Sequence, residues 1–480
     1  MTTDSRARRR NLLLITSDQH NPAFMSYLGH RDVQTPALDD LAAQGTVFTN
    51  AYCTSPICVP SRASMVTGRY VHETGHWDNA APYTGIPRSW GHALGEAGYQ
   101  VTTIGKLHYR DVGNDTGFPD QRLAMHIHLG GDLRGVSLRP QGEVPDREGK
   151  ARPLLRVGSG ETEYTRFDRA VATAAVKFLE DPPLEPWGLT VSFVAPHFPL
   201  IAPEDFYQLY DPSELTLPSP DSGAWDHPAI DVFKRAFGLS DVFTDQEKRS
   251  ALRAYLALCS YLDSLIGRVL DALSASGQAF NTLVVYTSDH GESAGAHGLW
   301  FKHLMNDESV GVPLIVAGPG VSIGQVVTTP VSHVDLFPTF LEGAGLARDD
   351  SLPGISLLDD SDQSDRAVMA EYHANGSTAA SFMLRHGRYK YIEYVGERPQ
   401  LFNLESDPDE MVDLARDPGH ADVLADCARR LRDFCDPDEV DALAKADQAR
   451  RVEQAGGLEA AAAVKIPYTP VPENVASELQ

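Results

Sequence analysis

Short apolar runs alternate with amphipathic segments along most of the chain. Five runs have the length and composition of strands: NLLLITSD, YQVTTIGK, LTVSFVAP, TLVVYTSD and VPLIVAGPG, at residues 11–18, 99–106, 189–196, 282–289 and 312–320. The intervening segments place apolar residues at helical spacing, at residues 35–45, 167–181 and 247–273. Continuous apolar runs are typical of strands buried on both faces, and their alternation with helices indicates parallel pairing. We therefore expect an α/β fold whose large, mostly parallel (mixed) sheet is sandwiched by helices.

The pattern changes after about residue 370. Residues 383–395, MLRHGRYKYIEYV, have the alternation of a strand pair, and residues 401–418 indicate a turn followed by a short helix. We expect an α/β domain at residues 1–370, a smaller C-terminal α+β subdomain at 371–443, and an extended tail at 444–480.

The predicted tail is rich in alanine and then in proline. Its last part reads IPYTPVPENVASELQ. Disorder is one interpretation of such a composition. The other is docking on a neighbouring subunit, because prolines hold the chain extended and reduce the entropy lost on docking.

Composition narrows the classes of function. The 480 residues include 41 Lys and Arg against 66 Asp and Glu, a net charge of −25. This acidic balance argues against nucleic-acid binding. Five cysteines, an odd number scattered over the chain, do not form the pattern of a disulfide framework and favour a reducing compartment.

The N-terminus has some features of a targeting segment, because arginines at positions 6, 8, 9 and 10 precede the apolar run LLLIT. That run is about five residues long, shorter than the ~7–15 apolar residues of a signal peptide, so we interpret it as the first strand. No stretch approaches the ~20 apolar residues of a membrane span. We expect a cytoplasmic protein with no membrane partner.

Two of the predicted strands end in polar pairs. The run at residues 11–18 ends in Asp18 and Gln19, and the run at residues 282–289 ends in Asp289 and His290. Ligands of parallel α/β sheets bind beyond the carboxyl ends of the strands. Three oxygen donors and one imidazole at that edge could hold Ca²⁺, Mg²⁺ or Mn²⁺. Alternatively, the two aspartates cap the helices that follow their strands.

One cysteine has an unusual neighbourhood. Cys58 opens the segment CVPSRASMVTGR, with Pro60 and Arg62 close behind it and Thr67-Gly68-Arg69 at its end. A buried structural cysteine does not need a charged neighbour, whereas a reactive thiol does. A cysteine nucleophile with a histidine base fits as well, and 17 histidines make chance pairing easy. Spacing alone leaves the choice open.

The same segment resembles the C-x-P-S-R-x-x-x-x-T-G-R signature of the type I, formylglycine-dependent sulfatases of the alkaline phosphatase superfamily. The resemblance extends over nearly the whole chain, through NLLLITSDQ, IGKLHY, VAPHFP, YLDSLIGRVLDAL, YTSDHG and LFNLESDPDE. Many members carry Asp-Asp and Asp-Asn where this chain has Asp18-Gln19 and Asp289-His290. That variant, together with WDNAA at residues 77–81, is similar to the branch of choline sulfatases and phosphonate monoester hydrolases.

The resemblance implies an alkaline-phosphatase-like fold and a specific chemistry. A maturation enzyme would oxidise Cys58 to formylglycine, and one divalent ion, Ca²⁺ or Mn²⁺, would be held by Asp18, Gln19, Asp289 and His290. One hydroxyl of the aldehyde hydrate would attack sulfur, and the other would then expel sulfate. Arg62 and Lys106 would orient the hydrate, and His108 would take its proton. His197 and Lys302 would stabilise the leaving oxygen.

The resemblance also gives expectations for the substrate. Asn79 and Trp77 would line the pocket, where an indole offers a cation–π surface to a quaternary ammonium, although Trp77 could equally be part of the core. We expect hydrolysis of sulfate monoesters of a small alcohol or arene, with choline sulfate as a candidate. The alternatives are a phosphonate monoester or phosphodiester hydrolase and an inactive metal-binding pseudoenzyme. A homo-oligomer, a dimer or tetramer, is also expected.

Overall fold

The largest sheet within the residues that the structure describes has eight strands, in the order β11-β2-β10-β9-β1-β7-β4-β5. The computed structural model describes residues 9–127, 137–140, 156–184, 186–218, 223–239, 243–359, 361, 363–463 and 469–472. The strands of this sheet are β1 (Asn11–Asp18), β2 (Gly45–Phe48), β4 (Gln100–Lys106), β5 (Asp120–Met125), β7 (Trp187–Pro196), β9 (Thr282–Ser288), β10 (Leu314–Ala317) and β11 (Gln325–Val327).

Most of the strand pairs in this sheet are parallel. Strand β1 lies in the middle and pairs in parallel with β7 and β9, and β4 pairs in parallel with β7 and β5. Strand β10 is antiparallel to both β9 and β2, which makes the sheet mixed. The predicted mostly parallel sheet is therefore confirmed.

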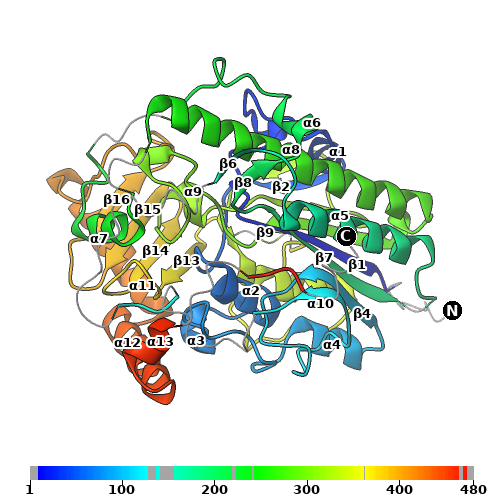
Figure 1. The fold of residues 1–480 in the computed structure, drawn as a ribbon. Coiled ribbons are helices and arrows are strands. Elements are labelled where there is room, and N and C mark those ends of the chain that lie inside the picture. The colour runs from blue at the N-terminus through cyan, green and yellow to red at the C-terminus, as the bar shows by residue number, and fades with distance from the viewer. Residues whose placement is uncertain are drawn as a thin grey trace.

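Helices cover both faces of the sheet, as Figure 1 shows. On one face α5 and α8 pack on β7, and α1 packs on β10 and β2; on the other, α4 packs on β4 and α10 on β1. Alternate residues of β1 accordingly belong to two different hydrophobic clusters. The helices are α1 (Pro36–Ala43), α2 (Cys58–Thr67), α4 (Trp90–Glu96), α5 (Glu163–Glu180), α8 (Asp245–Ala275) and α10 (Leu336–Gly343).

The two long helices begin at threonine caps. The Thr162 side chain accepts a hydrogen bond from the amide of Thr165 at the start of α5. Thr244 and Glu247 form a reciprocal capping box at the start of α8. Each cap satisfies amides that a helix leaves without partners in its first turn.

Short elements connect these layers. They are β3 (Ala51–Tyr52), α3 (Val71–Thr74), β6 (Val157–Ser159), β8 (Leu200–Ala202), α6 (Glu204–Tyr207), α7 (Pro228–Phe237), α9 (Asp307–Val310) and β12 (Val331–Ser332). Strand β3 pairs with β12, and β6 with β8, each in parallel.

The C-terminal part is a smaller α+β unit, as predicted. Four antiparallel strands run in the order β13-β14-β15-β16, and α11 packs on three of them. Its elements are β13 (Ala367–Tyr372), β14 (Ser381–His386), β15 (Tyr389–Tyr394), β16 (Gln400–Asn403), α11 (Ala421–Phe434), α12 (Pro437–Gln454) and α13 (Leu458–Ala463).

The prediction of an extended tail from residue 444 is wrong for its first part. Helix α12 continues to Gln454, and α13 follows. Asp436 caps α12, with Pro437 at the first helical position, and the Ala, Leu, Gln and Arg residues that follow have high helix propensity. Farther on, the carbonyl of Thr469 accepts a hydrogen bond from Tyr164 Oη of α5 at 2.6 Å. This described piece of the tail therefore packs on its own chain.

Within the described ranges, no helix has both the length and the apolar character needed to cross a membrane. All five cysteines lie in described segments, and each is a free thiol.

Candidate active site

Four strands of the large sheet deliver polar side chains to one edge. Strand β1 ends at Asp18, β4 at Lys106, and β9 immediately before Asp289, while His197 follows the last residue of β7. Because these strands are parallel neighbours, their carboxyl ends meet. Cys58, the first residue of α2, lies against this edge.

The sulfur of Cys58 has three polar neighbours. Sγ lies 3.3 Å from His290 Nε2, 3.7 Å from Lys302 Nζ and 3.8 Å from Asp18 Oδ1. Burial, with the Asp18 carboxylate beside it, raises the pKa of the Cys58 thiol to about 12. With only 2% of its surface exposed, the unmodified cysteine is a buried, protonated thiol.

Asp18 lies at the centre of the charges. Its carboxylate pairs with Lys106 and lies 3.7 Å from Arg62 and 4.0 Å from Lys302. Burial alone would raise the pKa of Asp18, but Lys106, His197, Lys302 and His290 hold it well below its usual value. Asp18 is therefore ionised at neutral pH.

Arg62 is a buried guanidinium with several partners. Nε donates to Asp289 Oδ2 at 2.7 Å, and one terminal nitrogen donates to the Lys106 carbonyl at 2.7 Å and to Ser192 Oγ at 2.9 Å. Burial disfavours its charge, but Asp289 and Asp18 outweigh that effect and raise the pKa of Arg62. The arginine thus joins α2 to the end of β4, to Ser192 within β7 and to the residue that follows β9.

Asp18, Cys58, Asp289 and His290 form a group that can hold a cation. One ligand atom from each lies within 4.8 Å of the others, and all four residues are buried. His290 Nδ1 donates to the Gly291 carbonyl at 2.9 Å, which leaves the lone pair of Nε2 directed at the cluster. Burial and the Asp18 charge raise the pKa of Asp289 to about 6. Two carboxylates and a neutral imidazole suit a divalent ion, so these residues fit the metal that the resemblance implies.

Gln19 is held beside the cluster in a fixed orientation. Its Nε2 donates to Glu292, and its Oε1 accepts a hydrogen bond from Lys302 Nζ at 2.6 Å. The backbone amide of Gln19 donates to Asp289 Oδ1 at 3.2 Å. The structure thus places Gln19 at the site, and its role as a ligand stays a prediction.

The two candidate histidines from β4 and β7 reach the same edge. His197 Nδ1 donates to the Phe198 carbonyl at 2.7 Å, and its Nε2 lies 3.9 Å from Asp18 Oδ1. Burial and the nearby Lys302 hold the pKa of His197 well below its usual value. His108 is buried two residues beyond Lys106 with a φ of 57°. Its proton-transfer role stays a prediction.

The two predicted pocket residues have other contacts. Asn79 Oδ1 accepts a hydrogen bond from the amide of Val59, the residue after Cys58, at 3.1 Å. Trp77 is 6% exposed and packs edge to face on His373, with ring centroids 5.0 Å apart. The structure therefore places Trp77 in a hydrophobic core, the alternative that the sequence left open, and offers little of its indole face to a ligand.

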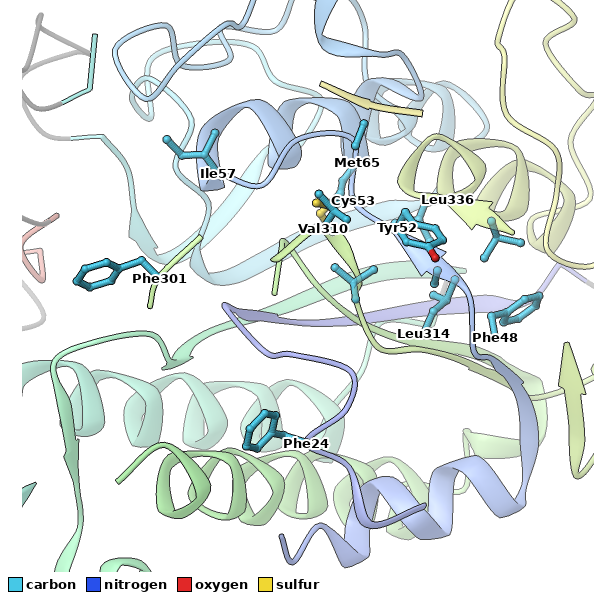
Figure 2. Packing of buried hydrophobic residues seen from close by; sticks show 14 of the residues in the cluster. Phe24, Phe48, Tyr52, Cys53, Ile57, Met65, Phe301, Val310, Leu314 and Leu336 are labelled. Carbon is cyan, nitrogen blue, oxygen red and sulfur yellow. The ribbon is translucent and has the colours of Figure 1, made fainter. Parts of the chain in front are cut away.

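Helix α2 is buried along its whole length, which fixes the direction of Cys58. Met65 of α2 belongs to the same apolar cluster as Cys53 and Val310, and Figure 2 shows the three close together, with Ile57 at the start of the helix. Ser61 Oγ donates to the Asp289 carbonyl, so polar contacts also tie the helix to the strand edge.

Sequence reasoning missed two residues that organise the site. Glu292 accepts hydrogen bonds from Gln19 and from the amide of Phe301, which lies at 2.6 Å. Asp168 accepts from the amides of Val194 and Ala195, both at 2.8 Å, and so fixes the end of β7 before His197. Asp168 was detectable as a carboxylate on the apolar face of a predicted helix, and Glu292 as an acid two residues after His290.

Comparisons with known proteins agree with this geometry. Residues 10–346 match the family model described as Sulfatase, and residues 295–437 match the model described as N-sulphoglucosamine sulphohydrolase, C-terminal. A choline-sulfatase of Rhizobium meliloti is 34% identical, over 92% of this chain and 90% of its own. Arylsulfatase K of Bos taurus is 30% identical, over 84% of this chain and 78% of its own.

Two solved structures have a fold similar to that of this chain. The phosphonate monoester hydrolase SpPMH of Silicibacter pomeroyi is 26% identical with a TM-score of 0.71, over 88% of this chain and 94% of its own. A putative sulfatase from Bacteroides thetaiotaomicron is 25% identical with a TM-score of 0.71, over 89% and 92% of the two chains. The chain therefore belongs to the sulfatase family of the alkaline phosphatase superfamily and is a sulfuric ester hydrolase.

Proposed function

We propose that the protein hydrolyses sulfate monoesters through a formylglycine made from Cys58, with one divalent ion, Ca²⁺ or Mn²⁺. The observation that carries this proposal is the position of Cys58 within its signature: it begins α2 and lies within 3.8 Å of a carboxylate, an imidazole and an ammonium group. Asp18, Gln19, Asp289 and His290 would hold the ion, which would polarise the reacting oxygens. The aldehyde hydrate supplies two hydroxyls on one carbon, one to attack sulfur and one to expel sulfate.

The surrounding side chains have separate tasks in this proposal. The ammonium group of Lys302 is directed at residue 58 and stabilises the negative charge that develops on the sulfate oxygens, with Lys106 beside it. Arg62 holds Asp289 and orients the nucleophile. His197 Nε2 faces the site and serves the leaving oxygen, and His108 takes the proton of the second hydroxyl.

Maturation requires a partner. Cys58 is 2% exposed and α2 is packed on all sides, so an oxidising enzyme cannot reach the thiol in the folded protein. We infer that a formylglycine-generating enzyme acts on this segment before the fold closes around it.

The structure says less about the alcohol part of the substrate than about its sulfate group. The choline-sulfatase relative supports choline sulfate as a candidate. An aromatic alcohol is supported by Phe198 and Phe237, two partly buried rings whose centroids lie 5.4 and 6.2 Å from that of Phe301. Lys302 Nζ lies 5.4 Å from the Phe198 ring centroid, so the Phe198 ring adjoins the proposed reacting group. We therefore propose sulfate esters of a small alcohol or arene.

Phosphonate monoesters and phosphodiesters form the second candidate class. The solved phosphonate monoester hydrolase SpPMH, 26% identical to this chain, supports it. Such esters carry one negative charge, as a sulfate monoester does, so the same cations can stabilise them.

A substrate panel on verified protein tests the proposal. Peptide mass spectrometry first measures the fraction of Cys58 converted to formylglycine, and Cys58→Ala provides the inactive control. Then kcat/KM is compared for an aryl sulfate, choline sulfate, a phenylphosphonate monoester and a phosphodiester. We expect a sulfate ester to be best. Full activity with an unmodified thiol would refute the nucleophile, and a preference above about tenfold, ~1.4 kcal/mol, for a phosphorus ester would favour the second class.

We also propose a cytoplasmic location and a homo-oligomer, a dimer or tetramer. The five free cysteines are in line with a reducing compartment.

A further inference from the structure

Helix α2 lacks a cap of its own. Its N-cap residue, Ile57, is apolar, and its side chain accepts no hydrogen bond. Pro60, the third residue of the helix, has no amide hydrogen. The N-terminus of a helix leaves its first amides without intrahelical partners, and an amide at the position of Val59 is normally bonded by an N-cap side chain.

Asn79 takes over this task from a separate loop. Its Oδ1 accepts the Val59 amide at 3.1 Å, next to Cys58 in the chain. The cap of the nucleophile helix thus comes from a residue 20 positions later in the sequence. Asn79 can do this only where its loop is held in place.

The neighbouring residue, Asp78, anchors that loop to the C-terminal helix α12. Its fully buried carboxylate accepts from both terminal nitrogens of Arg451, at 2.6 and 3.1 Å, and from Gln448 Nε2 at 2.9 Å. The amide of Ala80 donates to the same carboxylate at 2.8 Å. A bidentate arginine pair fixes both distance and orientation.

Apolar packing supports the same junction. Ala80 and Val452 of α12 share a small hydrophobic cluster, and Gln448 also donates to the His373 carbonyl at 2.8 Å. Helix α12 therefore holds the loop that caps the first turn of α2.

We propose that α12 positions the nucleophile through this chain of contacts, with Arg451, Asp78 and Asn79 as positioning residues. Arg451 fixes Asp78, Asp78 fixes the loop, and Asn79 holds the first turn of α2 and with it residue 58. The inference rests on residue 58 carrying the nucleophile. It also gives Asn79 a role in turnover rather than in binding the alcohol.

The expected effect is on turnover, because misplacing a reacting group by about 1 Å costs about 100-fold in rate. We expect Asn79→Ala and Arg451→Ala each to lower kcat about tenfold or more while KM for an aryl sulfate changes less than about threefold. Arg451→Lys keeps the charge but loses the fork, and should recover part of kcat. The control is Arg450→Ala on the same helix, an exposed residue that pairs with Asp447 and should leave kcat within about twofold.

A double-mutant cycle decides the question. All rates are normalised to the formylglycine content of each sample. If Arg451 acts through Asn79, the double variant should be no slower than Asn79→Ala by more than about twofold. The inference would be overturned if the fold-losses in kcat of the two single variants multiply in the double variant. A raised KM with unchanged kcat in Arg451→Ala would also overturn it.

Two measurements keep the test independent of folding and of the proposed chemistry. If Arg451→Ala does not fold, the cycle is run with Arg451→Lys, where the same coupling is expected and its absence refutes the proposal. A wild-type enzyme active with an unmodified Cys58 would contradict the formylglycine proposal, and the cycle would still measure positioning of that residue.

Discussion

Glu371 of β13 binds two histidines with one buried carboxylate. Oε1 accepts from His72 Nδ1 at 2.9 Å and from the His72 backbone amide at 3.0 Å, and Oε2 lies 2.8 Å from His373 Nε2. The Glu371 amide donates to the Thr54 carbonyl at 2.8 Å. The residue therefore joins α3 and the C-terminal sheet to the segment that leads to Cys58.

This environment makes a pH-dependent contribution to stability. Burial alone would raise the pKa of Glu371, but His72 and His373 lower it from 4.5 to about 2. At ~1.4 kcal/mol per pKa unit, the difference stabilises the folded state by about 3 kcal/mol. Because the folded pKa is the lower one, this stability is present above about pH 4.5 and is lost as the pH falls toward 2.

His72 determines how the stability from this ion pair changes at higher pH. Burial disfavours its charge, but Glu371 raises the pKa of His72 above 6.5. Its share of the stability is therefore fully present below pH 6.5 and is lost as the pH rises through the folded pKa. For the Glu371–His72 pair alone, the two effects together predict a maximum between about pH 5 and 6.5.

Urea unfolding of wild type and Glu371→Gln from pH 3.5 to 8.5 tests this reasoning. The loss of unfolding free energy should be about 3 kcal/mol near pH 6 and smaller at both ends of the range. Glu397→Gln, an exposed residue after β15, should change it by less than about 0.5 kcal/mol throughout. A loss that is the same at every pH would show that shape rather than charge explains the effect.

Two predictions concern the cation. Asp289→Ala should lower the metal content measured by elemental analysis and abolish activity, because Asp289 is the partner of Arg62 and a member of the buried cluster. A metal content equal to that of the wild type would exclude Asp289 as a ligand. Glu292→Gln should lower metal affinity or kcat about 10- to 100-fold, since Glu292 orients Gln19. Unchanged affinity in a chelator competition together with unchanged kcat would contradict the proposed role of Gln19 as a ligand.

The fold could be predicted where the pattern is local. Strand β1 has the predicted bounds, because an uninterrupted apolar run between polar residues marks a strand buried on both faces. Helix α5 begins at Glu163, four residues before the predicted start, because its first turn depends on the Thr162 cap rather than on apolar periodicity. The same cause explains the tail, where Asp436 and Pro437 start a helix that the alanine-rich composition did not reveal.

The site could be predicted only in part. Asp18 and Asp289 were found because parallel strands share one edge, so two strand ends imply one location. Contacts between distant segments carry no such signal. Asp78 and Arg451 are 373 positions apart, and the sequence around either residue does not indicate that the two are in contact.

The charges around residue 58 support the proposed chemistry but do not distinguish among its possible substrates. Three cations, Arg62, Lys106 and Lys302, face two carboxylates in the buried cluster, and such a set stabilises a transferring group of one negative charge whether its central atom is sulfur or phosphorus. A phosphate monoester approaches two negative charges at neutral pH, so it would need more positive charge around it than a singly charged ester does. Discrimination among singly charged esters must then come from contacts to the alcohol. Phe198, whose ring centroid lies 5.4 Å from Lys302 Nζ, is the proposed source of such contacts, and it lies outside the signature.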